Sequence, residues 1–295
     1  KCYQDAAFTQ PSAQLIRVGG GTYNVGTAPG AIVGTGSSAV AELPGNADVR
    51  IYRIRRDYAI VPESDLKKDA AEVNEIAESD VTPSQIAAVL AQYATDWDQW
   101  PVSKGAPYIE RNGTPGYQKP PAFSENFTVD SLISGNYDEP GLAGADPNSP
   151  ADMVIWTVAN DLNPTLTQGF EGADPMGIEV QYTIWGYKRS DALGQLYFKK
   201  AKLINKGGGL EGGSTRTQYW IDSMYVCSWS DPDLGSAGDD LAGCDSLLSM
   251  GFVYNGNATD NEFKKYNLPP PAAGYDFLQG PVVPSVGDSA VFDLK

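Results

Sequence analysis

The sequence predicts a mainly β fold, an antiparallel β-sandwich-like domain that carries a small helical insertion and long loops. Three observations predict this class. Strand-like segments follow one another from residue 153 onward, and glycine-rich turns separate them. The 32 glycines and 21 prolines favour many turns over long helices. A hydrophobic content of 41% supplies enough apolar material for a packed core.

The first strongly patterned segment follows an irregular N-terminal region, residues 1–48, which is rich in small residues. Residues 49–58 alternate in the way that a half-buried strand does, and they include four arginines. Because the chain is strongly acidic, we expect these arginines to pair with carboxylates inside the protein. A basic strip that binds a ligand is the alternative.

A pair of helices forms the predicted insertion, residues 64–100. Residues 65–78 predict a short helix whose inward positions are Ala70, Ala71, Val73 and Ile76. Residues 82–85 form a capping box with Pro83 in the first helical position, so a second helix begins there. Its apolar stripe consists of Ile86, Val89, Leu90, Tyr93 and Trp97. Pro101 ends it.

The remaining elements complete one large β-rich domain that spans residues 1–295. Prolines and glycines break residues 101–150 into a long irregular stretch. A strand-rich core covers residues 153–284. We expect strands in it at residues 153–160, 177–187, 195–205, 217–229 and 247–254.

Charge and composition exclude several function classes. A net charge of −16 repels the phosphate backbone, so no nucleic-acid partner is expected. The chain contains no histidine, which excludes Ser-His-Asp catalysis, imidazole general bases and histidine-ligated zinc. No apolar run approaches the ~20 residues of a membrane-spanning helix, so no membrane insertion is expected.

Residues 230–245, here called the acidic stretch, crowd five carboxylates together: Asp231, Asp233, Asp239, Asp240 and Asp245. Like charges this close repel one another unless a cation lies among them. Carboxylate and backbone carbonyl oxygens are the ligands that suit Ca²⁺, and the interspersed glycines let the backbone turn tightly around an ion. The spacing differs from that of an EF-hand loop. We predict a calcium site formed by these five residues; a solvated acidic turn is the alternative.

The chain contains three cysteines, Cys2, Cys227 and Cys244. Cys227 and Cys244 lie near the two ends of the acidic stretch and could close it as a disulfide, which would stabilise it by restricting the unfolded chain. Two buried free thiols that pack as small hydrophobic side chains are the alternative.

Several motifs carry a resemblance to a protein family. They are residues 229–245, 251–256 and 269–281, together with residues 49–56, 93–97, 104–108, 156–163, 175–181 and 203–206. These motifs resemble large secreted proteins of Bacteroidota-like Gram-negative bacteria, which typically end in a type IX secretion sorting domain. The resemblance covers most of residues 49–284. It implies an extracellular or cell-surface location within a longer parent chain, and it implies no particular reaction.

These observations favour an extracellular, non-catalytic structural or adhesive module that calcium stabilises. The expected partners are other copies, other domains of the parent chain or surface glycans.

Three alternative functions stay open. A carbohydrate-binding module would stack sugars on its tryptophans, which are Trp97, Trp100, Trp156, Trp185, Trp220 and Trp229. A subunit of a surface filament or layer would exchange strands between copies. A glycoside hydrolase would need two carboxylates, for which the candidates are Asp161, Glu179 and Asp222.

Overall fold

A computed structural model describes residues 2–12, 26–107, 109, 151–212 and 215–283. Most of the expected irregular stretch, residues 101–150, lies outside these ranges. The chain divides into two compact units, here called unit 1 (Lys1–Asp222) and unit 2 (Ser223–Lys295). Antiparallel sheets dominate both, and the described residues form four α-helices and no closed barrel. The predicted mainly β fold with a small helical part is therefore confirmed.

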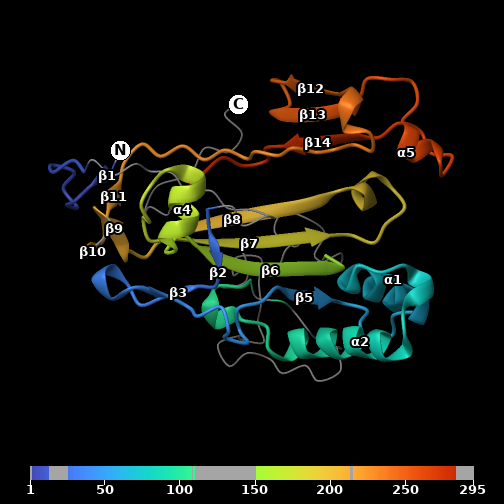
Figure 1. Ribbon diagram of the computed structural model, residues 1–295, viewed down its shortest axis with the longest axis horizontal. Coiled ribbons are helices and arrows are strands. Elements are labelled where there is room, and N and C mark those ends of the chain that lie inside the picture. Colours follow the sequence, from blue (N-terminus) through green and yellow to red (C-terminus); the bar gives the residue numbers. More distant parts are fainter. Residues whose placement is uncertain (1, 13–25, 108, 110–150, 213–214, 284–295) are drawn as a thin grey trace, which may run out of the picture. The chain divides into compact units, whose positions relative to one another are not determined.

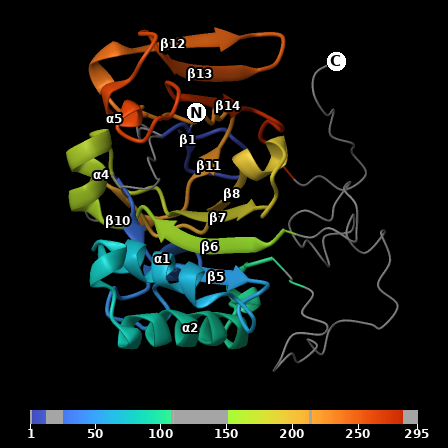
Figure 2. The same ribbon diagram turned by 90° about the vertical axis from the view of Figure 1, so that its right-hand side faces the viewer.

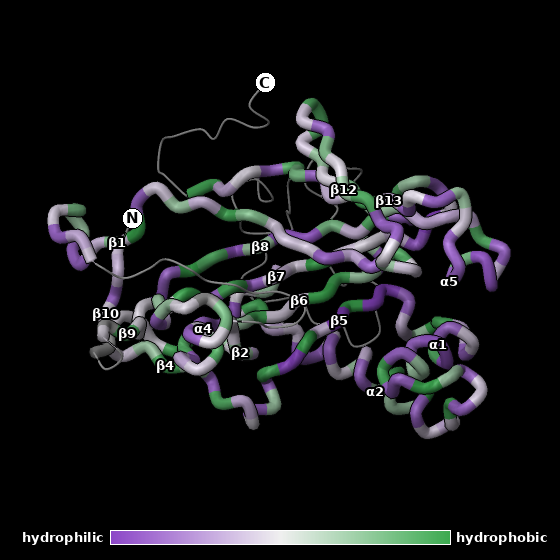
Figure 3. The backbone as a smooth tube through the Cα atoms, turned by 45° about the horizontal axis from the view of Figure 1, so that its top comes forward, coloured by the Kyte–Doolittle hydropathy of each residue, from purple (hydrophilic) through white to green (hydrophobic). Residues whose placement is uncertain are grey.

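A five-stranded antiparallel sheet organises unit 1 (Figure 1). Strands β6 (Met153–Asn160) and β7 (Ile178–Gly186) form its centre, and β8 (Tyr197–Asn205) pairs with β7 along its full length. On the other side, β2 (Ala28–Pro29) and β5 (Tyr52–Arg55) pair with opposite ends of β6. The three long strands agree with the predicted ranges to within two residues. Figure 3 shows hydrophobic residues along much of β6, as a central strand requires.

Helices α1 (Glu63–Asn74) and α2 (Pro83–Asp98) form the predicted helical insertion and pack against each other near β5 (Figures 1 and 2). The capping box at Thr82 is present, as predicted. Trp97 and Trp100 pack in one hydrophobic cluster with Tyr52 and Trp156 of the sheet. Their indole groups donate hydrogen bonds to backbone carbonyls, at 2.9 Å for Trp97 and 2.7 Å for Trp100. The insertion is thus fixed to the sheet by both apolar and polar contacts.

Helix α1 is shorter than predicted. It ends at Asn74, because Glu75 adopts a left-handed conformation with φ 54°. Val73 is exposed, although it was expected to face inward. The buried face is formed by Leu66, Ala70 and Ala71, whereas Val73 lies in the last turn, next to the end of the helix at Asn74.

Asp96 of α2 provides a hydrogen-bond acceptor for the edge of β5 that does not pair with β6. This fully buried carboxylate accepts hydrogen bonds from the Arg53 backbone N–H at 3.0 Å, from Gln92 at 3.0 Å and from the Arg50 guanidinium. Arg55 in turn donates to Asp57 at 2.7 Å and to Asp69. The expected pairing of the strand's arginines with internal carboxylates is confirmed for Arg50 and Arg55.

Short elements complete unit 1. The two-stranded pairs are β1 (Cys2–Tyr3) with β11 (Trp220–Ile221), β3 (Ile32–Val33) with β4 (Val40–Ala41), and β9 (Gly209–Glu211) with β10 (Thr215–Thr217). The 3-10 turns are η1 (Gly36–Ser38), η2 (Glu78–Asp80), η3 (Val102–Lys104) and η4 (Ala192–Gln195), and the α-helix α4 spans Pro164–Glu171. Within the described part of the chain, no helix is long and apolar enough to cross a membrane.

Unit 2 contains a three-stranded antiparallel sheet in the order β12 (Asp240–Asp245), β13 (Met250–Asn255) and β14 (Ala272–Asp276). The 3-10 turn η5 (Ala237–Asp239) precedes β12, and the short helix α5 (Asn261–Lys264) lies between β13 and β14 in the sequence. The acidic stretch is therefore half loop and half strand.

The predicted strand at residues 217–229 is wrong. Within that range only Thr217, the last residue of β10, and Trp220–Ile221 form strands, and Trp220–Ile221 pairs with the two residues of β1. The strand expected at residues 247–254 begins later, at Met250. A turn precedes it, in which Ser249 adopts φ 54° and Asp245 accepts the backbone N–H groups of Leu247 and Leu248.

We expect Asp96→Ala to lower the free energy of unfolding by about 3 kcal/mol, because it leaves the Arg53 N–H and the Arg50 guanidinium without their shared acceptor. Thermal or denaturant unfolding of unit 1 measures this loss. Asp98→Ala is the matched control on the same helix, since Asp98 is exposed, and it should change stability by about 0.5 kcal/mol or less. Equal losses for the two variants would contradict the assigned role of Asp96.

Candidate metal centre

The structure separates the five aspartates of the predicted calcium site. Asp231 and Asp233 are exposed in a segment that forms no helix or strand, and Asp240 and Asp245 occupy the two ends of β12. Five residues of extended strand span about 17 Å, so one ion cannot contact both ends of β12. No three acidic or cysteine side chains converge on a metal-sized centre within the described ranges. Asp239 and Asp240 are adjacent in the chain and stay together.

Asn255, which the prediction did not include, joins Asp239 and Asp240. It stands directly opposite Asp240 in the register of β12 and β13, where facing Cβ atoms lie about 5 Å apart. Its Nδ2 donates a hydrogen bond of 2.9 Å to Asp239 Oδ2. Asn257 donates to the same oxygen at 2.6 Å, and the Leu234 N–H donates to Asp240 Oδ2 at 2.9 Å. One oxygen of each carboxylate is therefore already occupied.

The second oxygens of this group are buried without a partner. Asp239 Oδ1, Asp240 Oδ1 and Asn255 Oδ1 make no hydrogen bond with any described residue. Asn255 is only 8% exposed, so its amide oxygen is held away from water. A buried acceptor without a donor costs about 1–3 kcal/mol, and more when it is charged. Three such oxygens, two of them from carboxylates, fit the oxygen-rich ligand set of Ca²⁺.

Asp260 holds the loop that leads into this oxygen cluster. It is 1% exposed, and its Oδ2 accepts the Ser236 N–H at 2.9 Å. Its Oδ1 caps α5 by accepting the N–H groups of Glu262 and Phe263, both at 2.9 Å. These backbone donors, Phe263 first, lower the pKa of Asp260, so the carboxylate stays ionised at neutral pH. Gly235, at φ 77°, makes the close approach possible, since a Cβ there would lie 2.3 Å from Asp260 Oδ1.

Unit 2 has no hydrophobic core of its own. Among residues 223–283, the buried side chains are those of Asn255 and Asp260, and both are polar. Small units without a core usually depend on a disulfide, a metal or association. Cys227 and Cys244 are exposed free thiols, so this structure shows neither the predicted disulfide between them nor the alternative of two buried thiols.

Two of the three candidate carboxylates of the hydrolase alternative are buried and accept several hydrogen bonds. Asp161 accepts the N–H groups of Met176, Gly177 and Ile178 at 2.7, 2.9 and 2.7 Å. Glu179 accepts hydrogen bonds from Lys206 at 2.6 Å, and also from the Ile32 N–H and Gln181 at 2.7 Å each. Neither side chain reaches the surface, whereas the third candidate, Asp222, is exposed. Asp161 and Glu179 therefore act as structural acceptors that join loops to the sheet.

The six tryptophans of the carbohydrate-binding alternative do not share one surface. Trp97, Trp100 and Trp156 lie in the core. Trp185 is half-buried and stacks on Phe198 with ring centroids 5.5 Å apart. Trp220 is half-buried, and only Trp229 is widely exposed, at 81%. Most of these rings fill space inside the protein.

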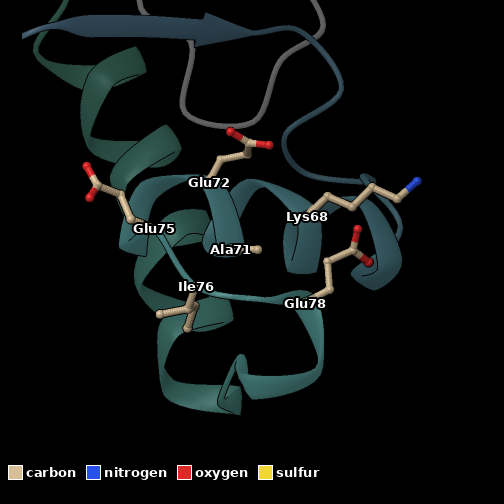
Figure 4. A pocket seen from close by; sticks show the side chains of 6 residues that line it. All are labelled: Lys68, Ala71, Glu72, Glu75, Ile76 and Glu78. Atoms are coloured by element: carbon tan, nitrogen blue, oxygen red, sulfur yellow. The ribbon is translucent and has the colours of Figure 1, made fainter. Parts of the chain in front are cut away.

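A hollow lies between α1 and η2, and Figure 4 shows it. Its lining consists of Lys68, Ala71, Glu72, Glu75, Ile76 and Glu78. The three glutamates point in different directions, so they do not present a common ligand set. The hollow is a solvated acidic surface.

Burial raises the pKa of Asp161 to about 6, against the opposing effect of its three backbone donors. Because the folded pKa exceeds that of the unfolded chain, the native state holds an extra proton between about pH 4 and pH 6. This contribution to stability is present at low pH and falls by up to about 3 kcal/mol as pH rises through that window. Asp161→Asn lacks the titration, so the stability difference between wild type and variant should shrink from pH 4 to pH 7 in urea titrations. A constant difference would contradict this assignment.

Comparison of the chain with family models, with curated proteins and with solved structures finds no match in any of the three.

Proposed function

We propose that this chain is an extracellular, non-catalytic structural or adhesive module, and that a calcium ion fastens its C-terminal unit. The observation that carries the proposal is the group of three buried acceptor oxygens at Asp239, Asp240 and Asn255, none of which has a donor among the described residues. A divalent cation would neutralise the two carboxylates and supply the missing interactions together.

The composition of unit 2 supports the same proposal. Among residues 223–283 two polar side chains and no hydrophobic one are buried, so apolar burial contributes little to the stability of the unit. Binding of an ion to the folded form alone would supply part of that stability. The ligand types favour calcium over zinc, because the cluster offers only carboxylate and amide oxygens.

Two further considerations support the non-catalytic, extracellular part of the proposal. Buried carboxylates of unit 1 join backbone segments, because Asp161 accepts the Gly177 N–H and Glu179 accepts the Ile32 N–H. The sequence resemblance to secreted bacterial proteins suggests a location where free calcium is abundant. A structural ion suits that setting, since weak sites are occupied at extracellular concentrations.

We expect added calcium to raise the melting temperature of unit 2 and EDTA to lower it. A ligand that binds only the folded state stabilises it by about 2.7 kcal/mol at a free concentration a hundredfold above Kd. Amide hydrogen exchange of β12 and β13 in matched calcium and EDTA buffers measures the effect locally. Unchanged exchange, together with no metal in the purified protein by elemental analysis, would refute the calcium proposal.

Paired variants locate the site. Asp239→Asn with Asp240→Asn keeps the size of both side chains and removes their charge, so the calcium response should disappear. Asp231→Asn with Asp233→Asn removes the same charge from the exposed part of the acidic stretch and should leave the response intact. Isothermal titration with calcium compares the two pairs. Loss of binding in the second pair as well would favour a diffuse effect of acidic charge.

A further inference from the structure

Strand β8 is the open edge of the five-stranded sheet. Lys206, which follows β8, donates its backbone N–H to Gly177 O at 2.9 Å, and this bond fixes the alternation along the ladder. Even-numbered residues of β8 therefore turn their backbone groups toward β7. Odd-numbered residues, including Tyr197, Lys199, Ala201 and Leu203, turn theirs outward. No described residue pairs with these outward N–H and C=O groups.

The edge is basic although the chain as a whole is acidic. Lys199, Lys200 and Lys202 are exposed within four positions of β8, in a chain whose net charge is −16. Lysines on an edge strand usually keep other strands away. They do so less effectively against a strand that brings acidic side chains, because opposite charges then meet across the new pair.

Unit 2 contains a segment with the properties of such a strand, residues 223–233, here called the donor segment. It forms no helix or strand, and none of its backbone groups makes a hydrogen bond with a described residue. The sequence from Met224 to Trp229 has the aromatic and β-branched side chains that strands favour, and Tyr225 is 96% exposed. Asp231 and Asp233 lie directly after these residues and carry negative charge.

We infer that the donor segment of one copy adds to the β8 edge of a second copy as a sixth strand. The outward N–H and C=O groups of β8 then form hydrogen bonds with the backbone of the donor segment. The acidic end of the donor segment lies near the lysines of β8. Each copy has one donor and one edge, so the contact is head-to-tail and generates open chains or closed rings. The inference concerns assembly and does not depend on the calcium ion.

The test uses two variants, each defective on one side. Ala201→Pro removes an outward N–H from β8 without removing a hydrogen bond to β7, so it blocks the edge. Val226→Pro with Cys227→Pro blocks the donor, since one of two neighbouring residues must turn its N–H to the edge. In sedimentation velocity, the wild type should form species larger than dimers as concentration rises. Each variant alone should stay monomeric, and an equal mixture of the two should form a one-to-one dimer.

Matched controls and other outcomes make the test decisive. Ala201→Val and Val226→Thr keep the backbone N–H groups and should associate like the wild type. A wild type that stays monomeric at every concentration would overturn the inference, as would a mixture that fails to dimerise. Association that Ala201→Pro abolishes and the donor variant preserves would show edge-to-edge pairing of two β8 strands instead. Circular dichroism of each variant confirms that the sheet is folded.

Discussion

Burial of carboxylates is the constraint on which this structure depends. A carboxylate removed from water needs donors or a cation around it. In unit 1 the donors come from the protein itself. Asp96 closes the edge of β5, Asp161 collects three backbone N–H groups, and Glu179 receives Lys206 and the N–H of Ile32. Each of these contacts joins a helix or loop to the same sheet, so the charges define where the irregular segments attach.

Unit 2 follows the same rule but uses fewer protein donors. Asp260 is fully satisfied and anchors the loop before β12. Asp239, Asp240 and Asn255 each keep one buried oxygen without a donor. The buried carboxylates of unit 1 thus have protein donors, whereas Asp239 and Asp240 each keep one oxygen without a donor, and this difference is the basis of the proposed calcium site.

Local patterns in the sequence predicted the elements that depend on local interactions. The capping box at Thr82 and the long alternating strands β6, β7 and β8 follow from side-chain period and backbone capping, which neighbouring residues decide. The residues after Ile221 have strand-like composition, yet they form no strand, because a strand also needs a partner and composition does not supply one. The prediction that Val73 faces inward was wrong for a similar reason, since the contact with α2 decides which face of α1 is buried.

The candidate site was predicted only in part, for a related reason. The many aspartates in the acidic stretch led to the prediction of a cation site. The sequence did not show that Asp240 and Asp245 occupy opposite ends of β12. Asn255 joins the cluster through the register of β12 and β13, which is a long-range property. Asp260 could have been noticed, because an aspartate just before Asn-Glu-Phe is a typical N-cap.

The absence of buried apolar side chains among residues 223–283 has a thermodynamic consequence. The heat capacity change of unfolding comes mainly from newly exposed apolar surface, and it gives a stability curve its strong curvature. A unit that buries so little of that surface has a stability curve with little curvature, so its free energy of unfolding falls almost linearly as the temperature rises. Cooling would therefore weaken this unit less than it weakens a domain with a large apolar core.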